Sequence, residues 1–311
     1  MHIPNSMLQG TICPVTAIIS TLGVIVAAIS AIRSENKPTA ARFGAITAFI
    51  FAGQMMNFPI QNGTSGHLLG GVLAAALLGV PFGVLAMALV VVIQCVVFSD
   101  GGFSVLGANV LNMALVGAGL GGILKSVFLK DPFMKNGRDT VKLGLIAWFS
   151  VMLATFACSL ELAFAGTIAF SKVAVAMFGT HALIGIGEAV ITIAACFAFS
   201  REKVNVSEKR LVYVPLVAAG VIAMMLSPFA SGFPDGLEWV AQKYRFLHEA
   251  APSFTSPLTD YAVPSVGNEA ISTGLAGLTG IVIAFFAAWG IARILNMLSQ
   301  TKNSAIEMSR G

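Results

Sequence analysis

Apolar residues form long runs along the whole chain, and short polar stretches separate them. A run of about 20 apolar residues can cross a bilayer as a helix, and irregular backbone cannot face lipid. The chain lacks the alternating polarity that is typical of a membrane β-barrel. We therefore predict nine membrane-spanning helices, at 12–32, 42–57, 67–80, 82–98, 105–125, 141–168, 172–199, 212–230 and 270–293.

The third and fourth predicted spans are short and meet at Gly79-Val80-Pro81. Glycine and proline together mark a break between helices. We expect this part of the chain to form a hairpin or a tilted pair of helices.

Composition agrees with a membrane protein. Charged residues make up 10% of the chain, hydrophobic residues make up 57%, and the mean hydropathy is +0.87. A soluble domain carries about 25% charged residues. The fold class that we predict is an all-α integral membrane protein, a polytopic helical bundle of seven plus two helices.

Lysine and arginine predict the orientation of the bundle, because they gather in cytoplasmic loops. With the N-terminus outside, 15 of the 18 basic residues fall inside. The net charge of +4 therefore reflects topology, and we expect no nucleic-acid partner. The first ten residues hold no Lys or Arg, so we also expect no cleaved signal peptide. The predicted location is the cell membrane, with multiple spans.

The charged segment near 200–211 divides the chain into two predicted modules. The first covers 1–200, a linker covers 201–211, and the second covers 212–311 with an external loop at 231–269. Part of that loop, PDGLEWVAQKYRFLHEA, has the spacing of a short amphipathic helix. No nucleotide-binding loop of the GxxxxGK[ST] type occurs, so any ATP hydrolysis must come from another subunit.

The first two residues, Met1 and His2, carry the strongest candidate chemistry. The terminal amine, the His2 amide nitrogen and the His2 ring form a three-nitrogen chelate. A distant imidazole such as His67, which follows the segment NGTSG, would complete a square. Square-planar nitrogen sites suit Ni(II) or Cu(II). The alternative is that His2 belongs to a frayed terminus.

Polar residues at the external ends of the predicted spans are expected to converge on this site. Buried polar groups in membranes are functional candidates, although many only join helices by hydrogen bonds, and Asp100 could equally lie in an exposed turn. The candidates for groups that surround the ligands are Gln54, Asn57, Thr64, Ser65, Gln94, Asp100 and Asn109.

Other potential ligands are weaker. His181 and Glu188 share one helix face at a spacing of seven, and structural pairing with neighbours is favoured over metal binding. His248 lies in the external loop without an evident partner. The four cysteines lie in apolar spans without a CxxC pair, which indicates neither a disulfide framework nor a zinc site.

Four motifs resemble a known family when they are taken together and in order. They are MHIPNSM, QMMNFPIQNGTSGHLLGG, QCVVFSDGGFSVLGANVLNM and HALIGIGEAVIT, all within about 1–200. They resemble the substrate-binding M component of nickel/cobalt energy-coupling-factor (ECF) transporters. The remainder, with PDGLEWVA and SPLTDYAVPSVGN, resembles the small two-span N component, so the chain resembles an M–N fusion.

The resemblance implies a metal square made by the Met1 amine, by His2 through its amide and ring, and by His67. It implies Ni(II) or Co(II) as the transported ion, and a transmembrane T component with two ABC-type ATPases as partners. It also implies that a small-residue face in the first span, at Ala27 and Ala31, docks the T component; ordinary internal packing is the alternative.

Other functions remain open from the sequence. Co(II) tolerates octahedral geometry, whereas four coplanar nitrogens favour nickel. An intramembrane metalloenzyme would need a catalytic base beside an open metal position, and the chain has no HExxH motif. A passive channel would not retain metal on purification. We expect all ligands to lie before residue 200, so that the second module serves metal loading and not equilibrium binding.

Overall fold

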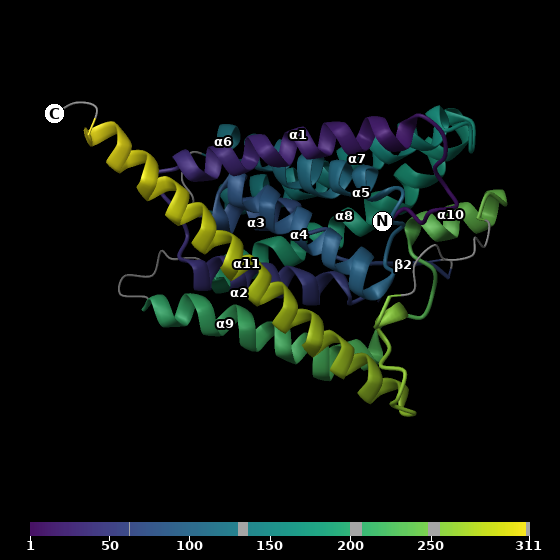
Figure 1. The fold of residues 1–311 in the computed structure, drawn as a ribbon. Helices are drawn as coiled ribbons and strands as arrows, with labels where there is room; N and C mark the ends of the chain where they lie inside the picture. The colour runs from purple at the N-terminus through teal and green to yellow at the C-terminus, as the bar shows by residue number, and fades with distance from the viewer. Residues whose placement is uncertain (62, 130–135, 200–206, 248–255, 309–311) are drawn as a thin grey trace.

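The protein is a bundle of long helices with two short strands at one end (Figure 1). The computed structural model describes residues 1–61, 63–129, 136–199, 207–247 and 256–308. The helical elements of the first module are α1 (Ile12–Arg33), α2 (Ala40–Gln54), α3 (Gly71–Leu78), α4 (Val80–Phe98), α5 (Leu106–Val110), η1 (Leu111–Leu120), α6 (Gly121–Phe128), α7 (Gly137–Phe164) and α8 (Phe170–Phe199). A hairpin of β1 (Phe58–Pro59) and β2 (Ser65–Gly66) joins α2 to α3.

The second module adds two long helices and a structured loop. Its elements are α9 (Glu208–Val221), η2 (Ile222–Leu226), η3 (Ser227–Phe229), α10 (Gly236–Tyr244), η4 (Thr259–Tyr261) and α11 (Glu269–Met308). The predicted amphipathic helix is confirmed as α10, where Leu237 and Val240 are fully buried. Most of the predicted linker and His248 lie outside the described residues.

The prediction of a polytopic helical membrane protein is confirmed. Among the described residues, seven helical segments are long and apolar enough to span a bilayer. They are Ile12–Arg33, Val80–Phe98, Leu106–Phe128, Gly137–Phe164, Phe170–Phe199, Glu208–Phe229 and Glu269–Thr301. The third of these is continuous through α5, the π-helical turns of η1, and α6.

The other two predicted spans are shorter than expected. α2 has 15 residues, and α3 begins only at Gly71, not at 67, and has 8 residues. Both are largely buried, so neither has to present a full apolar length to lipid. Extended backbone before α3 is tolerated at this depth because protein surrounds it. The expected break between the third and fourth spans falls at Gly79, with a φ of 85°.

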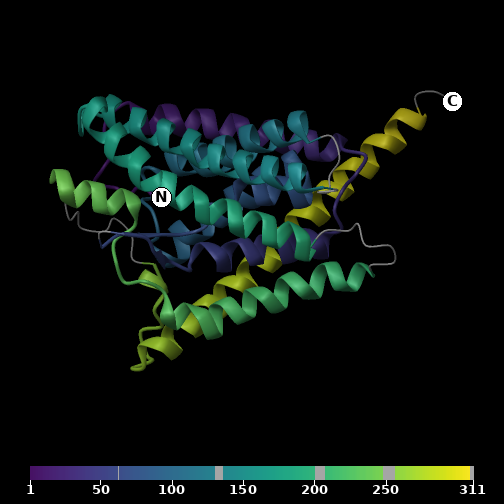
Figure 2. The ribbon, with the colours of Figure 1, turned by 180° about the vertical axis from the view of Figure 1, so that it is seen from behind.

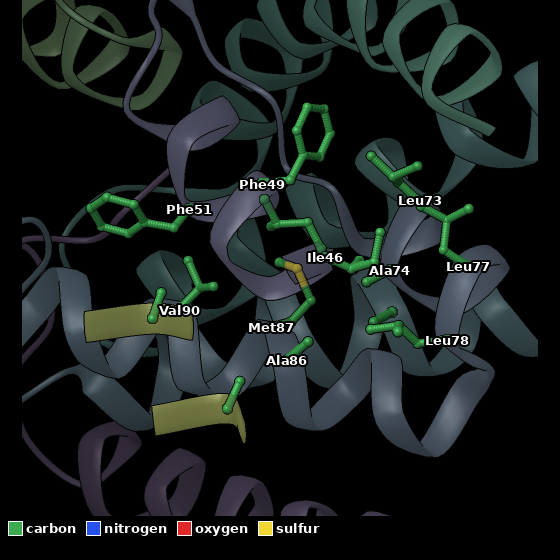
Figure 3. Packing of buried hydrophobic residues seen from close by; sticks show 14 of the residues in the cluster. Ile46, Phe49, Phe51, Leu73, Ala74, Leu77, Leu78, Ala86, Met87 and Val90 are labelled. Carbon is green, nitrogen blue, oxygen red and sulfur yellow. The ribbon is translucent and has the colours of Figure 1, made fainter. Parts of the chain in front are cut away.

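The core lies where α2, α3 and α4 meet (Figure 3). Ile46 of α2, Leu73 of α3 and Met87 of α4 are all fully buried there. The second module covers the other side of α2, because α9 and α11 lie against it (Figure 2). At Gly44 of α2, a Cβ atom would lie 2.8 Å from the Phe285 carbonyl oxygen of α11. The two modules therefore share one core.

Chain segments far apart in sequence meet at one end of the bundle. The N-terminus, the β1–β2 hairpin and α10 lie together there (Figure 1). α9 begins at the opposite end of the bundle (Figure 1). We call the first of these the site end.

Candidate metal centre

The first residues form an extended segment that is buried at the site end. The Ile3 N–H donates to Asn109 Oδ1 at 2.8 Å, and Asn109 Nδ2 donates to the Ile3 carbonyl at 3.1 Å. The Gly102 N–H donates to the same carbonyl at 2.9 Å. Met1 and His2 are 3% and 7% exposed. Hydrogen bonds to Asn109 and Gly102 therefore fix the backbone of the segment at Ile3. His2 is buried and does not belong to a frayed terminus.

Glycine permits this close approach. Gly101 has a φ of +89°, and a Cβ atom there would lie 2.8 Å from Asn109 Nδ2. At Gly102, a Cβ atom would lie 2.4 Å from the Asn5 backbone nitrogen. Any side chain at Gly102 would therefore displace the N-terminal segment.

The Met1 amine lies in direct contact with His67 Nε2, inside the protein. His67 Nδ1 lies 2.9 Å from the Leu68 carbonyl oxygen, which can only accept a proton. Nδ1 therefore carries the ring proton, and the Nε2 lone pair points at the amine. The His2 and His67 rings stack, with centroids 5.2 Å apart and planes 16° from parallel.

His2 is held through both ring nitrogens. Its Nδ1 lies 3.1 Å from Asp100 Oδ1, and its Nε2 lies 3.1 Å from Gln94 Oε1. Tyr261 of the second module joins this network, because its hydroxyl donates to Asp100 Oδ2 at 2.6 Å and accepts from Gln94 Nε2 at 3.2 Å. A neutral imidazole carries one N–H, so it can donate to only one of the two oxygens.

Asp235, like Tyr261, is a residue of the site that the sequence patterns did not predict. Its Oδ2 lies 3.1 Å from the Met1 amine and 3.9 Å from His67 Nε2. It stands in the PDGLE segment of the external loop, in the second module. Sequence did carry one signal, the capping-box spacing of Asp235 and Glu238 ahead of an amphipathic run. That spacing predicts where a helix begins, but it does not predict that the Asp235 carboxylate contacts the Met1 amine.

Electrostatics at the site keep the imidazoles neutral and Asp235 ionised. Burial lowers the pKa of His2 and of His67, and the positive charge of the terminal amine lowers both further. Burial alone would raise the pKa of Asp235, but the terminal amine and His67 outweigh it and hold that pKa below its ordinary value. Neutral nitrogens beside a carboxylate are what a cation requires as ligands.

A cavity of about 470 Å³ opens onto the candidate ligands. It is lined by His2 and His67, by the carboxyl-bearing residues Asp100, Asp235, Glu238 and Asp260, and by neutral groups. Burial, followed by the neighbouring Asp235 charge, raises the pKa of Glu238. A wall rich in carboxylates favours a cation over an anion.

The remaining candidates divide into those at the site and those elsewhere. Gln54 and Asn57 line the cavity, and Gln54 Nε2 donates to the Leu69 carbonyl at 2.6 Å. Thr64 lies beside a separate cavity next to α10. Ser65 anchors the second module, because its N–H donates to the Pro234 carbonyl at 2.8 Å.

His181 and Glu188 both contact backbone groups of their neighbours. His181 Nδ1 lies 2.9 Å from the Met177 carbonyl oxygen. The Glu188 carboxylate accepts from the Leu69 and Gly70 N–H groups at 2.7 and 2.9 Å, and so caps the start of α3 just after His67. The four cysteines are free thiols in the described structure.

The small-residue pair of α1 faces inward. Ala27 and Ala31 are 7% and 0% exposed and belong to the main core. The outer face of α1 instead carries large residues, among them Leu22 and Val26. The side chains of Ala27 and Ala31 therefore face the rest of this chain, and T-component docking through them stays a prediction.

Among the described residues, no three His, Cys, Asp or Glu side chains are grouped as a metal site of the usual kind. The candidate site at Met1 does not depend on three such side chains, because the terminal amine and the His2 amide nitrogen are two of its candidate ligands. The fold and the site together define a polytopic helical membrane protein with a nitrogen-rich, cation-attracting centre near one face.

Comparison with known proteins places the chain in a family. Residues 2–206 match the cobalt uptake substrate-specific transmembrane region, and residues 209–297 match the PDGLE domain. The chain is 33% identical over 302 residues to a putative fused nickel transport protein NikMN of Archaeoglobus fulgidus, which spans 94% of this chain and 98% of that protein. It is 30% identical over 205 residues to a putative cobalt transport protein CbiM of Methanocaldococcus jannaschii, covering 62% of this chain and 84% of that one.

A solved structure resembles a large part of this chain. A crystal structure of a truncated transition metal transporter matches with a TM-score of 0.56 and 28% identity, covering 63% of this chain and 97% of that one. The chain belongs to the family of nickel and cobalt transporter membrane components, with a PDGLE domain following the cobalt-uptake region.

Proposed function

We propose that the chain captures Ni(II) outside the cell and presents it for import as the substrate-binding component of an ECF-type transporter. The observation that supports this most strongly is the buried contact between the Met1 amine and His67 Nε2. A free amine and an imidazole lone pair face each other inside a membrane protein, at the end of a cavity rich in carboxylates. Ion capture explains this arrangement, whereas structural packing does not require it.

The proposed ligands are the Met1 amine and the His2 amide nitrogen, each after losing one proton to solvent as the metal binds, together with His2 Nδ1 and His67 Nε2. Coordination through His2 Nδ1 exchanges its Asp100 contact for the metal, and Nε2–H then donates to Gln94 Oε1. His67 is oriented by the Leu68 carbonyl. Hydrogen bonds of this kind from the second ring nitrogen are typical of metal-ligating histidines.

Four nitrogens in one plane favour Ni(II) over Co(II), which accepts octahedral oxygen-rich sites more readily. The relative that spans nearly the whole chain is described as a nickel transport protein, which supports the same choice. Co(II) is the alternative cargo, since a second relative is described as a cobalt transport protein.

Transport also needs subunits that this chain does not contain. We propose a transmembrane T component and two ABC-type ATPases, because the sequence carries no nucleotide-binding loop. The site end faces outward in this proposal, because that orientation puts 15 of the 18 basic residues on the cytoplasmic side.

The test is metal analysis of the purified chain with a free N-terminal amine. We expect one tightly held Ni(II) per chain after exposure to equal Ni(II) and Co(II), and its loss in His67→Ala. Reconstitution with the T component and the ATPases should make nickel uptake depend on ATP. Purified protein that retains neither metal would contradict the proposal and would favour a channel.

A further inference from the structure

A residue of the second module lies at the candidate metal centre. Asp235 belongs to the loop that follows η3, yet its Oδ2 lies 3.1 Å from the Met1 amine. Its side chain is 13% exposed, and that of Met1 is 1% exposed. This ion pair has little access to water, so its effect exceeds the small effect of a surface ion pair. The carboxylate therefore constrains the position of the Met1 amine.

Each residue of the PDGLE segment helps to place this carboxylate. The Pro234 carbonyl accepts the Ser65 N–H at 2.8 Å, beside the strand that leads to His67. Asp235 Oδ1 accepts from the Leu237 and Glu238 N–H groups at 2.8 and 2.9 Å. The Glu238 side chain accepts the Asp235 N–H in return, which completes a capping box.

The helix that follows is locked against the first module. A Cβ atom at Gly236 would lie 3.0 Å from His181, Ile184 and Thr180 side-chain atoms of α8. Leu237 is fully buried in the cluster that contains Met1 and Ile3. Gly236 and Leu237 therefore fix the position and the rotation of α10 against α8. Because Oδ1 of Asp235 is used by the helix cap, Oδ2 is the oxygen that contacts the amine.

The geometry points to Asp235 as a positioning residue of the metal centre: it holds the Met1 amine against His67 and supplies a negative charge beside a dication. This inference rests on the proposed function and deepens it. The two oxygens of the Asp235 carboxylate have different partners. Oδ1 accepts hydrogen bonds from the first turn of α10, and Oδ2 contacts the Met1 amine. The PDGLE segment is then part of the ion-binding site and not only a spacer between helices.

The test uses the full-length chain with two substitutions, Asp235→Asn and Asp235→Ser. Both residues remain good N-caps, so α10 should persist. Asn removes the charge, and Ser is too short to reach the amine. Asp139→Asn, in the first turn of α7 beyond the cap residue Asn136, is the charge-matched control far from the site. Two quantities are measured: the Ni(II) dissociation constant, and the acylation rate of the Met1 amine in metal-free protein, followed on the N-terminal peptide.

We expect both Asp235 variants to bind Ni(II) about 10–100-fold more weakly, as for other groups that orient metal ligands. Their Met1 amine should be acylated faster than in wild type, since the carboxylate no longer holds it. Asp139→Asn should match wild type in both measurements. A purely structural role of Asp235 predicts no change in either, because both variants still cap the helix.

Wild-type nickel affinity in both variants, or an unchanged acylation rate, would overturn the inference. The outcome for the proposed function is separate. If wild type itself holds no nickel, the proposed function fails, and the acylation rates of the metal-free proteins still decide whether Asp235 holds the amine.

Discussion

The N-terminal segment reaches the proposed metal centre because Gly102 leaves space for it and Asn109 forms hydrogen bonds with it. Asn109 pairs with both the N–H and the carbonyl of Ile3, as a neighbouring strand would. Gly102 provides the space for Asn5. The position of the Met1 amine is therefore set by contacts several residues away from the proposed ligands.

Gly102→Ala should weaken nickel binding without unfolding the protein. The added methyl group would lie 2.3 Å from Asn5 Oδ1 and 2.4 Å from the Asn5 backbone nitrogen. Overpacking of this kind costs about 1–3 kcal/mol, so we expect an affinity loss of about tenfold. The measurement is competitive nickel titration, with Gly137→Ala as control, because no atom lies within 4 Å of a Cβ there. Equal affinities in the two variants would show that the segment adjusts freely.

The bound nickel should be diamagnetic and yellow. Four nitrogen donors in a plane pair the d electrons of Ni(II), whereas octahedral sites with oxygen ligands leave two electrons unpaired. Magnetic susceptibility of stoichiometric nickel protein, together with its visible absorption spectrum, measures this directly. A paramagnetic signal from the bound ion would reject the square-planar ligand set.

The sequence proposed Met1 and His2 because the chelate that they would form is local, and it proposed His67 because of its amide-rich setting. Gln94, Asp100 and Asn109 were expected near the site, and the structure brings all three there. Asp235 and Tyr261 were not predicted. They approach the site from more than 160 residues away in sequence, and only the packing of α10 and η4 brings them in.

Among the elements, α3 is the one that departs most from the pattern of apolar runs. Its apolar run continues into α4 through the break at Gly79, so hydropathy alone cannot show where a helix of only 8 residues begins. The start is set by tertiary structure, because the Glu188 carboxylate accepts the two N–H groups that precede the helix. Long helices such as α7 and α8 were predictable because their apolar length alone dictates them.

Glu188→Gln should both destabilise the protein and weaken nickel binding. A glutamine offers one oxygen and one NH₂ group, so one of the Leu69 and Gly70 N–H groups loses its acceptor. Losing a hydrogen bond to a charged group costs about 1.5–3 kcal/mol. The loosened segment carries His67, and we therefore expect a lower Tm in detergent together with reduced affinity.

Thr192→Val is the matched control for that substitution. It lies one turn along on α8, is fully buried, and its hydroxyl has no hydrogen-bond partner in the described structure. It should keep wild-type affinity and stability. If Glu188→Gln also kept wild-type affinity despite a lower Tm, the cap of α3 would be irrelevant to His67.

At the scale of the whole molecule, the two modules pack into one core, and residues of both meet at the candidate metal centre. Sequence divides them at a charged segment, and from sequence we expected the second to matter for loading alone. The structure instead covers α2 with α9 and α11, and it places Asp235 on the Met1 amine. No pattern along the chain shows contacts between modules, so this part of the architecture required the structure.

Removal of residues 212–311 should therefore weaken equilibrium nickel binding, by about 10–100-fold from the loss of Asp235 alone. Supplying the second module as a separate chain should restore binding, since the contacts are noncovalent. Equilibrium dialysis of nickel against the truncated chain, with and without the co-expressed second module, measures both effects. Full affinity in the truncated chain would return the second module to a role in loading only.

The most direct test of the account is nickel binding by the full-length chain before and after acetylation of its terminal amine. The amine is proposed as one of four ligands, and an acetylated nitrogen can no longer act as an amine donor, so binding should be lost. In a companion chain with one residue inserted between Met1 and His2, the histidine moves to the third position and completes a four-nitrogen chelate alone. There, His67→Ala should have no effect, whereas in the native sequence the same substitution should abolish binding. Nickel binding that survives acetylation unchanged would contradict the terminal-amine centre.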